Sequence, residues 1–374
     1  MTQIEALDDQ LNELATVYAF CRNRRTQLRI GARSIGWGLL GASHVASELI
    51  VPAVRRQPSA QDDDSQAGAW VAAVFSHNER RARAFADANQ IPMAAVNLTD
   101  LLDRPEIRCI YVSSHPRHRY PLIMAALNAG KHVLCEPPLA LSAAEAQTLV
   151  AAAAHRSRVL AVNFTARANP AVRTLRRLIR DDHLGDLLSG SVSNFTLLPP
   201  PLQTWRLQPG GGGVIFDRTI HAIDLLRFLL SDEIGAVFAT AGQASLAHSA
   251  SAGAEEEVVG VAQLARRRIL VQLHDAFFPG HRLSRIELEG THQSATIEQW
   301  APPHSSPTLT LHRQRRSTHL ELPDYDPIWL TFYQFQLAVS QMGSALASGD
   351  DGVRALQVCE ALHRSVKEQV LLEL

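Results

Sequence analysis

The chain has 374 residues, 46% hydrophobic and 20% charged, with a formal net charge of −1, which is typical of a globular protein with room for two domains. A near-neutral charge without a basic stripe argues against a nucleic-acid partner, and the lack of any apolar run of about 18 residues argues against a membrane span. The four cysteines are far apart and form no CxxC pair, which favours buried free thiols in a cytoplasmic protein over a metal site or a set of disulfides.

Residues 1–28 predict an amphipathic helical extension. Ile4, Leu7, Leu11, Leu14 and Tyr18 recur at spacings of three and four, which places one apolar stripe on a helix. The stripe could contact a partner or dock on the chain's own body. Docking is favoured because fewer than three heptads rarely sustain a coiled coil.

Residues 29–150 predict a Rossmann dinucleotide-binding domain of the α/β class. Strand patterns such as 35–41, 69–76 and 107–114 alternate with helical patterns, and a further strand pattern follows at 159–164. This alternation indicates a parallel sheet with right-handed crossovers.

A phosphate-binding turn is predicted where the first strand meets the first helix. Gly41, Ala42, Ser43, His44 and Val45 stand where the pattern G-x-G-x-x-G/A belongs, so all five are candidate cofactor-binding residues. Gly41 can form the tight turn, and the Ser43 hydroxyl could donate to a phosphate oxygen. An ordinary strand–helix turn is the alternative.

The end of the second strand indicates which nicotinamide cofactor would bind. An acidic residue there would bind the ribose 2′-hydroxyl of NAD, but the chain has Ser76 followed by Arg80 and Arg81. Arginine binds phosphate through paired, charge-assisted hydrogen bonds, so NADP(H) is the predicted cofactor. The alternative is that both arginines only solvate a helix face.

Residues 151–374 predict a second α/β domain with a large, mostly antiparallel sheet that is open on one face. Long alternating strand patterns dominate it, and helices predicted at 217–230 and 329–348 interrupt or close it.

The helix after the glycine run 210–213 carries the most reactive side chains. Asp217 and His221 are four residues apart and therefore share a helix face, and Asp224 follows three residues later. A histidine can exchange a proton with a substrate oxygen near neutral pH, and a neighbouring carboxylate can orient it or hold substrate hydroxyls. A histidine satisfied within the core is the alternative.

Together these features resemble the Gfo/Idh/MocA oxidoreductase family, and within it the bacterial 1,5-anhydro-D-fructose reductases. The likeness rests on "GWGLLGASHVA", "VFSHNERR", "AGKHVLCEPPLA", "LPPPLQTWRL" and "GGGGVIFDRTIHAIDLLRFLL" and spans nearly all of residues 35–370. It implies hydride transfer between NADP(H) and a carbohydrate-like substrate in a cleft between the domains, with His221 as acid/base and Asp217 in the substrate site. It also implies that the open sheet could form a homodimer. Further cofactor-side residues implied by position are Ser113, Ser114, His118, Glu136, Trp205 and Arg206.

Two positions depart from the family pattern. The family's Glu-Lys-Pro reads Glu136-Pro137-Pro138, so the lysine expected beside the reacting oxygen is absent, and the loop at 113–118 lacks the family's asparagine. The only two lysines, Lys131 and Lys367, lie elsewhere. Arg167 is the candidate cationic replacement, with Asp224 as a second candidate substrate-binding residue.

Two functions follow from these residues. The first is an NADP(H)-dependent oxidoreductase acting on a sugar-like or polyol-like ketone or alcohol. The second is a catalytically impaired family member that binds a dinucleotide as a sensor or assembly protein. The Asp217/His221 pair favours the enzyme, whereas Pro137 favours the binding protein.

Overall fold

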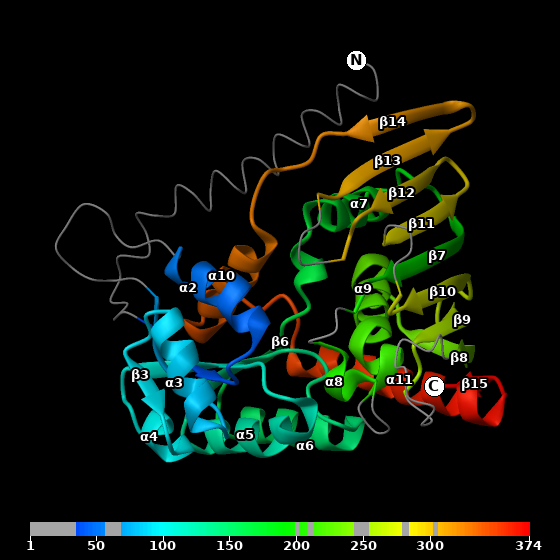
Figure 1. Cartoon of the computed structure of the whole chain (residues 1–374). Helices are drawn as coiled ribbons and strands as arrows, with labels where there is room; N and C mark the ends of the chain where they lie inside the picture. Colours follow the sequence, from blue (N-terminus) through cyan, green and yellow to red (C-terminus); the bar gives the residue numbers. More distant parts are fainter. Residues whose placement is uncertain are drawn as a thin grey trace.

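The computed structural model describes residues 35–56, 69–198, 202–207, 212–242, 254–278, 284–301 and 306–374. The helical extension predicted at 1–28 lies outside these residues. Within them the chain forms two halves, each built on one sheet, that lie side by side (Figure 1).

The first half contains a parallel six-stranded sheet with the strand order β3-β2-β1-β4-β5-β6. All five strand pairs are parallel, which confirms the Rossmann prediction. The strands are β1 (Gly36–Leu40), β2 (Trp70–Phe75), β3 (Met93–Ala95), β4 (Ile107–Val112), β5 (His132–Cys135) and β6 (Leu160–Val162). Because β6 belongs to this sheet, the domain boundary predicted at residue 150 falls inside a helix that precedes the last strand.

Helices cover both faces of this sheet (Figure 1). One face is covered by α4 (Leu98–Leu102), α5 (Pro116–Asn128) and α6 (Ala143–His155). The other is covered by the π-helical segment η2 (Ala46–Ile50), α2 (Val51–Arg55), α3 (Glu79–Ala88) and α10 (Pro327–Val339).

The position of α10 differs from the sequence-based prediction, which assigned residues 329–348 to the second sheet. The ring of Phe332 lies 4.9 Å from that of Trp37 and 5.7 Å from that of Tyr111, and Phe335 lies 5.4 Å from Trp37. All four rings are buried. The apolar face of α10 therefore closes the Rossmann core, which needs a second layer on this side.

The second half contains a nine-stranded sheet with the order β14-β13-β12-β11-β7-β10-β9-β8-β15. Only the β7–β10 pair is parallel, so the predicted antiparallel character is confirmed. The strands are β7 (Leu187–Phe195), β8 (Ile234–Gly242), β9 (Glu257–Leu264), β10 (Leu270–Ala276), β11 (Arg285–Gly290), β12 (Ser294–Glu298), β13 (Thr308–Arg313), β14 (Arg316–Leu320) and β15 (Leu372–Glu373). One face carries the helices α7 (Pro170–Arg180), α9 (Ile220–Leu230) and α11 (Gly349–Glu368).

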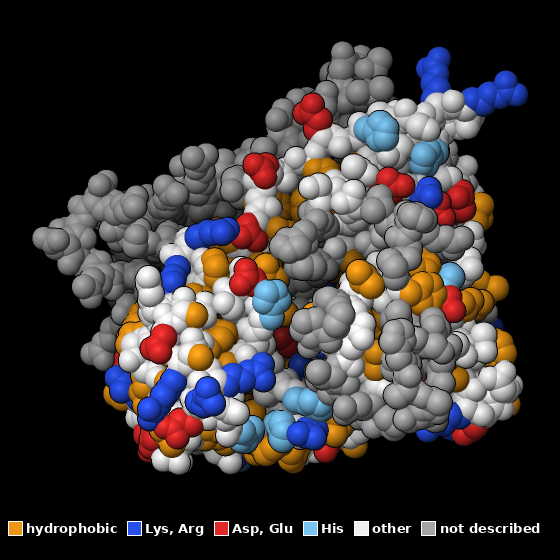
Figure 2. All heavy atoms as spheres, viewed as in Figure 1, with side chains coloured by type: hydrophobic (Ala, Val, Ile, Leu, Met, Phe, Trp, Pro, Cys, Tyr) orange, Lys and Arg blue, Asp and Glu red, His pale blue; other side chains and the backbone are white. Residues whose placement is uncertain are grey.

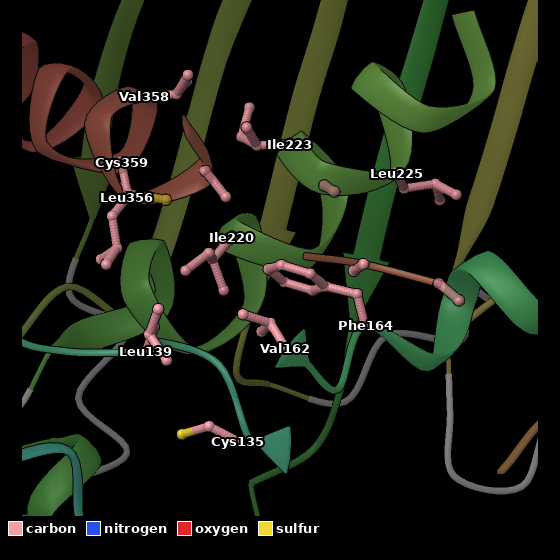
Figure 3. Close-up of a cluster of buried hydrophobic side chains, with 14 of the residues drawn as sticks. Cys135, Leu139, Val162, Phe164, Ile220, Ile223, Leu225, Leu356, Val358 and Cys359 are labelled. Carbon is pink, nitrogen blue, oxygen red and sulfur yellow. The ribbon is translucent and has the colours of Figure 1, made fainter. Parts of the chain in front are cut away.

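A shared apolar core joins the two halves (Figure 3). Cys135, Leu139 and Phe164 from the first half pack in one buried cluster with Ile220 of α9 and Leu356 of α11. Interiors packed in this way resist small displacements. The helix that carries His221 is therefore held in a fixed position relative to the ends of β5 and β6.

Candidate functional site

The candidate site lies where the parallel strands end. Gly41, Ser76, Ser113, Glu136 and Asn163 each directly follow a strand of the six-stranded sheet. Ligands of open parallel sheets bind outside these carboxyl ends. Figure 2 shows a hollow between the two halves on this face, with acidic and basic side chains at its depth.

The turn after β1 brings two strand ends into close contact. Gly41 has a φ of +123°, and a Cβ built on it would lie 2.6 Å from the amide nitrogen of Ser114. The Gly41 amide donates to the Phe75 carbonyl over 2.9 Å. Glycine is therefore required here both for its backbone angle and for the space it leaves.

The Ser43 hydroxyl, which the sequence suggested as a phosphate donor, makes its hydrogen bonds inside the turn. It donates to Ser113 Oγ over 2.8 Å and accepts from the Ala46 amide over 3.1 Å, while Ser113 Oγ lies 3.3 Å from the Gly41 carbonyl, to which it donates. The Ser43 hydroxyl proton therefore forms a hydrogen bond within the turn. A phosphate at this turn would instead meet backbone amides at the helix N-terminus, near the exposed His44 and Val45.

The first helix begins with a wide turn. Residues 46–50 are π-helical, and Pro52 follows in α2, so the hydrogen-bond ladder lacks a donor there. π-turns of this kind are frequent at functional sites.

Arg81 is anchored to the phosphate turn. Its Nε donates to the Ala42 carbonyl over 3.0 Å, and its backbone amide is capped by Asn78 Oδ1 over 2.9 Å. Ser76 Oγ accepts from the Asn78 amide over 3.3 Å, and Arg80 is exposed on the same helix. Of the three residues predicted to bind the 2′-phosphate, Arg81 contacts the turn directly, Ser76 follows β2, and Arg80 lies exposed on α3.

Histidines gather at the end of β4, where sequence reasoning selected only His118. The rings of His77 and His118 lie 4.8 Å apart, and those of His115 and His118 lie 6.0 Å apart. Burial and the nearby Arg117 lower the pKa of His115 to about 4, and burial and His77 also lower the pKa of His118. Both imidazoles are therefore neutral donors and acceptors at neutral pH.

Glu136 is held by two residues that sequence reasoning missed. Tyr111 Oη and Asn163 Nδ2 both donate to Glu136 Oε1. Burial raises the pKa of Glu136, although the two hydrogen bonds oppose this effect. Both partners stand at or just after the end of a parallel strand, and that position could have identified them.

Asp217 lies between two guanidinium groups. Its Oδ1 accepts from Arg206 Nε over 2.8 Å, and its Oδ2 lies 3.2 Å from Arg218 Nε. Burial alone would raise the pKa of Asp217, but Arg218 and Arg206 bring it below its ordinary value. The carboxylate therefore stays ionised, and Arg218 is a site residue that the sequence did not indicate.

His221 lies one turn further along the same helix. Residues 215–219 form a π-turn, η5, so the pair is not on a regular α-helical face. The imidazole meets the Phe164 ring edge-on at 5.7 Å between centroids, and its Nδ1 is buried without a hydrogen-bond partner among the described residues. Burial and Arg218 lower the pKa of His221 to about 4, so its resting form is neutral.

Arg167 and Asp224 do not reach the site with free polar groups, contrary to the prediction. Arg167 donates to Asp224 through Nε over 2.8 Å and through Nη2 over 2.6 Å, and it also contacts the Asp351 carboxylate at 2.9 Å. Both partners of the Arg167–Asp224 pair are buried. This bidentate pair ties α9 to the chain between β6 and α7, so both side chains stabilise the packing of the fold and do not line the site.

The backbone of Trp205 lies in α8 (Gln203–Arg206), but its side chain is outside the described part of the structure. Within the described ranges, no cluster of three or more His, Cys, Asp or Glu side chains could hold a metal ion. No described helix has the length and apolar character that crossing a bilayer requires. Cys109, Cys135 and Cys359 are buried free thiols, as predicted.

The fold and the arrangement of the strand-end residues are those of a two-domain nicotinamide-dependent oxidoreductase. Residues 35–164 match the oxidoreductase family with an NAD-binding Rossmann fold, and residues 172–296 match the GFO/IDH/MocA C-terminal domain. The chain belongs to the GFO/IDH/MocA oxidoreductase family.

Several similar proteins are named for sugar substrates. The chain is 32% identical over 324 residues to 1,5-anhydro-D-fructose reductase of Ensifer adhaerens, covering 86% of this chain and 92% of the relative. It is 29% identical to dTDP-3,4-didehydro-2,6-dideoxy-alpha-D-glucose 3-reductase of Streptomyces antibioticus, covering 87% and 94%. The structure of aldose-aldose oxidoreductase from Caulobacter crescentus shares the fold, with a TM-score of 0.81, 20% identity, and coverage of 91% of this chain and 100% of that one.

Proposed function

We propose that the chain is a cytoplasmic, NADP(H)-dependent oxidoreductase that moves hydride to or from a sugar-like or polyol-like ketone or alcohol, with His221 as acid/base. The observation that carries this proposal is the neutral imidazole of His221, packed on Phe164 at the end of β6 and one turn from the ionised Asp217. The sugar class comes from the relatives, since 1,5-anhydro-D-fructose reductase matches most of the chain.

The residues at the strand ends suit a dinucleotide. Backbone amides of residues 42–45 at a helix start are donors for a pyrophosphate, and the buried Ser114 Oγ has no partner among the described residues. Arg81 has its Nε on the Ala42 carbonyl, which leaves its two terminal nitrogens for a 2′-phosphate. When bound, the nicotinamide would supply the hydride donor or acceptor.

His221 handles the proton in this proposal. In alcohol oxidation, the neutral imidazole accepts the hydroxyl proton while the carbonyl forms. In ketone reduction, a protonated imidazole donates to the oxygen as negative charge develops on it. The negative charge of Asp217 favours the protonated form of His221. The same charge offsets the repulsion between Arg206 and Arg218.

The proposal is tested by titrating the purified chain with NADPH and NADH and following intrinsic fluorescence. Turnover is then assayed on 1,5-anhydro-D-fructose, other keto-sugars and polyols, with His221→Gln as the matched control. NADPH-dependent turnover that is lost in the control supports the proposal. Tight NADPH binding without turnover would favour the alternative, a dinucleotide-binding protein. The observation behind that alternative is Pro137, which stands where the family has a lysine. Binding of neither dinucleotide would overturn both.

We also propose that two copies associate through the outer face of the nine-stranded sheet. Phe238 of β8 and Val261 of β9 are directly opposite each other and remain 41% and 38% exposed. A contiguous exposed apolar patch marks an interaction site, and this pair would form part of one. Light scattering of wild type and Val261→Asp tests this, because the charge would convert a dimer into a monomer; a wild-type monomer would refute it.

A further inference from the structure

The turn after β5 lacks a side-chain cation where the proposed chemistry would use one. Pro137 has neither charge nor a backbone N–H, and Pro138 follows it through a cis peptide bond. Negative charge that develops on a substrate oxygen is best stabilised by positive charge already fixed nearby. Such a charge must come from elsewhere in the fold.

Arg119 lies directly behind this turn. It belongs to α5, it is only 5% exposed, and its Nη1 donates to the carbonyls of Glu136, over 2.7 Å, and of Pro138. Its guanidinium group therefore touches the main chain on both sides of Pro137. Its Nε donates to the Ser114 carbonyl over 2.9 Å, which connects the turn after β5 to the end of β4.

The charge of Arg119 is not cancelled by a direct ion pair. All three of these acceptors are neutral carbonyls, and no carboxylate of a described residue lies within 4.0 Å of its nitrogens. Its field acts on the acid of the turn: burial raises the pKa of Glu136, and Arg119 opposes this effect together with the larger contributions of the Tyr111 and Asn163 hydrogen bonds. Arg167, the cation suggested by the sequence, differs in this respect because Asp224 and Asp351 neutralise it.

We infer that Arg119 is a positioning residue that supplies, from behind the turn, the positive charge that Pro137 cannot carry, and that fixes Glu136 and residues 137–138 against Ser114. This inference rests on the proposed function. Arg119 acts through Glu136 and the main chain of the turn and does not itself contact substrate. A chain with this arrangement needs no lysine at position 137.

Exchanging the charge between positions 119 and 137 tests the inference. Arg119→Gln removes the positive charge, whereas Arg119→Lys keeps the charge without the planar guanidinium group. Pro137→Lys places an ammonium group in the turn, and Pro137→Met is its uncharged control. The first readout is the carbon-13 NMR titration of the Glu136 carboxyl, assigned with Glu136→Gln, which requires no cofactor. The second is NADPH affinity and its pH dependence.

The inference predicts that Arg119→Gln raises the pKa of Glu136 and weakens NADPH binding about tenfold, the scale of one charge-assisted contact. Arg119→Lys keeps the Glu136 titration near that of wild type even if it lowers thermal stability. Pro137→Lys restores NADPH affinity in the Arg119→Gln background, relative to Pro137→Met, but brings no gain in the wild-type background. That non-additivity is the signature of one shared electrostatic role.

Two results would overturn the inference. The first is a folded Arg119→Gln variant with the wild-type Glu136 titration. The second, which applies even if Arg119→Gln does not fold, is a tenfold or larger rise in turnover of Pro137→Lys over Pro137→Met in the wild-type background, because it would show that the turn lacks a cation. If the wild type binds no NADPH, the proposed function fails, while the Glu136 titration still decides the role of Arg119.

Discussion

Arg206 Nε donates to Asp217 Oδ1 over 2.8 Å, and this ion pair joins the short helix α8 to the π-turn that precedes His221. The same guanidinium contributes to the low pKa of His115 at the end of β4. Arg206 is therefore close enough to both halves for its charge to act on each side of the hollow between them.

Replacing Asp217 by Asn leaves Arg206 and Arg218 facing each other without a counter-charge. We expect kcat/KM to fall about 100-fold, the scale for losing one preorganised electrostatic group, together with a lower Tm. Steady-state kinetics and thermal melts measure both effects. Asp181→Asn is the control, because Asp181 also pairs with two arginines, Arg177 and Arg180, but lies at the end of α7. Activity of Asp217→Asn within threefold of wild type would contradict the role given to the carboxylate.

Replacing His221 by Gln should lower kcat by about 10²–10⁴-fold, the usual contribution of a general acid or base, with little change in NADPH affinity. The pH profile gives a sharper test. Because the pKa of His221 is lowered to about 4, the imidazole is a competent base at any higher pH. The kcat/KM for alcohol oxidation should therefore decline only as the pH falls toward 4. A decline centred near the ordinary histidine pKa of about 6.5 would contradict this.

Replacing Arg81 by Gln removes the guanidinium anchored beside the phosphate turn. We expect the Kd for NADPH to rise about 10–100-fold and the Kd for NADH to change little, because only NADPH carries a 2′-phosphate. Fluorescence titration with both cofactors measures the ratio. Arg83→Gln is the matched control, since Arg83 lies on the same helix but pairs with Glu79. An equal loss for both cofactors would indicate a purely structural role for Arg81.

Asp275 predicts a pH dependence of stability. It is fully buried in β10 behind the π-turn, and burial raises the pKa of its carboxyl from 3.8 to about 7, against the opposing effects of Thr219 and Arg218. A carboxyl with a raised folded-state pKa contributes stability that is complete below pH 3.8 and is lost as the pH rises through about 7. Asp275→Asn should therefore gain in Tm relative to wild type as the pH rises over this range. Parallel Tm curves for the two proteins would show that Asp275 does not titrate there.

Much of the site was predictable from the sequence because its residues follow strands in a regular way. Gly41 and Ser76 were selected because they end predicted strands, and Glu136 was selected from the family resemblance; each lies at the carboxyl end of the parallel sheet. Asn163 also directly follows a strand and Tyr111 is the last residue but one of β4, but neither belongs to a familiar motif. They become recognisable only when the sheet brings both to the Glu136 carboxylate.

The assignment of Arg167 shows where sequence reasoning fails. A lone arginine near a strand end looks available for substrate, but its true partners lie 57 and 184 residues further along the chain. The placement of α10 failed for a similar reason. An apolar helix indicates that it must bury one face, but not which of two sheets it will cover.

The sequence by itself determined the order of strands and helices, the turn at Gly41 and the Asp217/His221 spacing, because these depend on hydrophobic periodicity and backbone angles over a few residues. Only the tertiary structure decided which charges are neutralised. The balance of desolvation and Coulomb energy depends on neighbours brought together from distant parts of the chain. That balance leaves Asp217 ionised between Arg206 and Arg218 and pairs Arg167 with Asp224 and Asp351. The same folding places Arg119 against the main-chain carbonyls on both sides of Pro137.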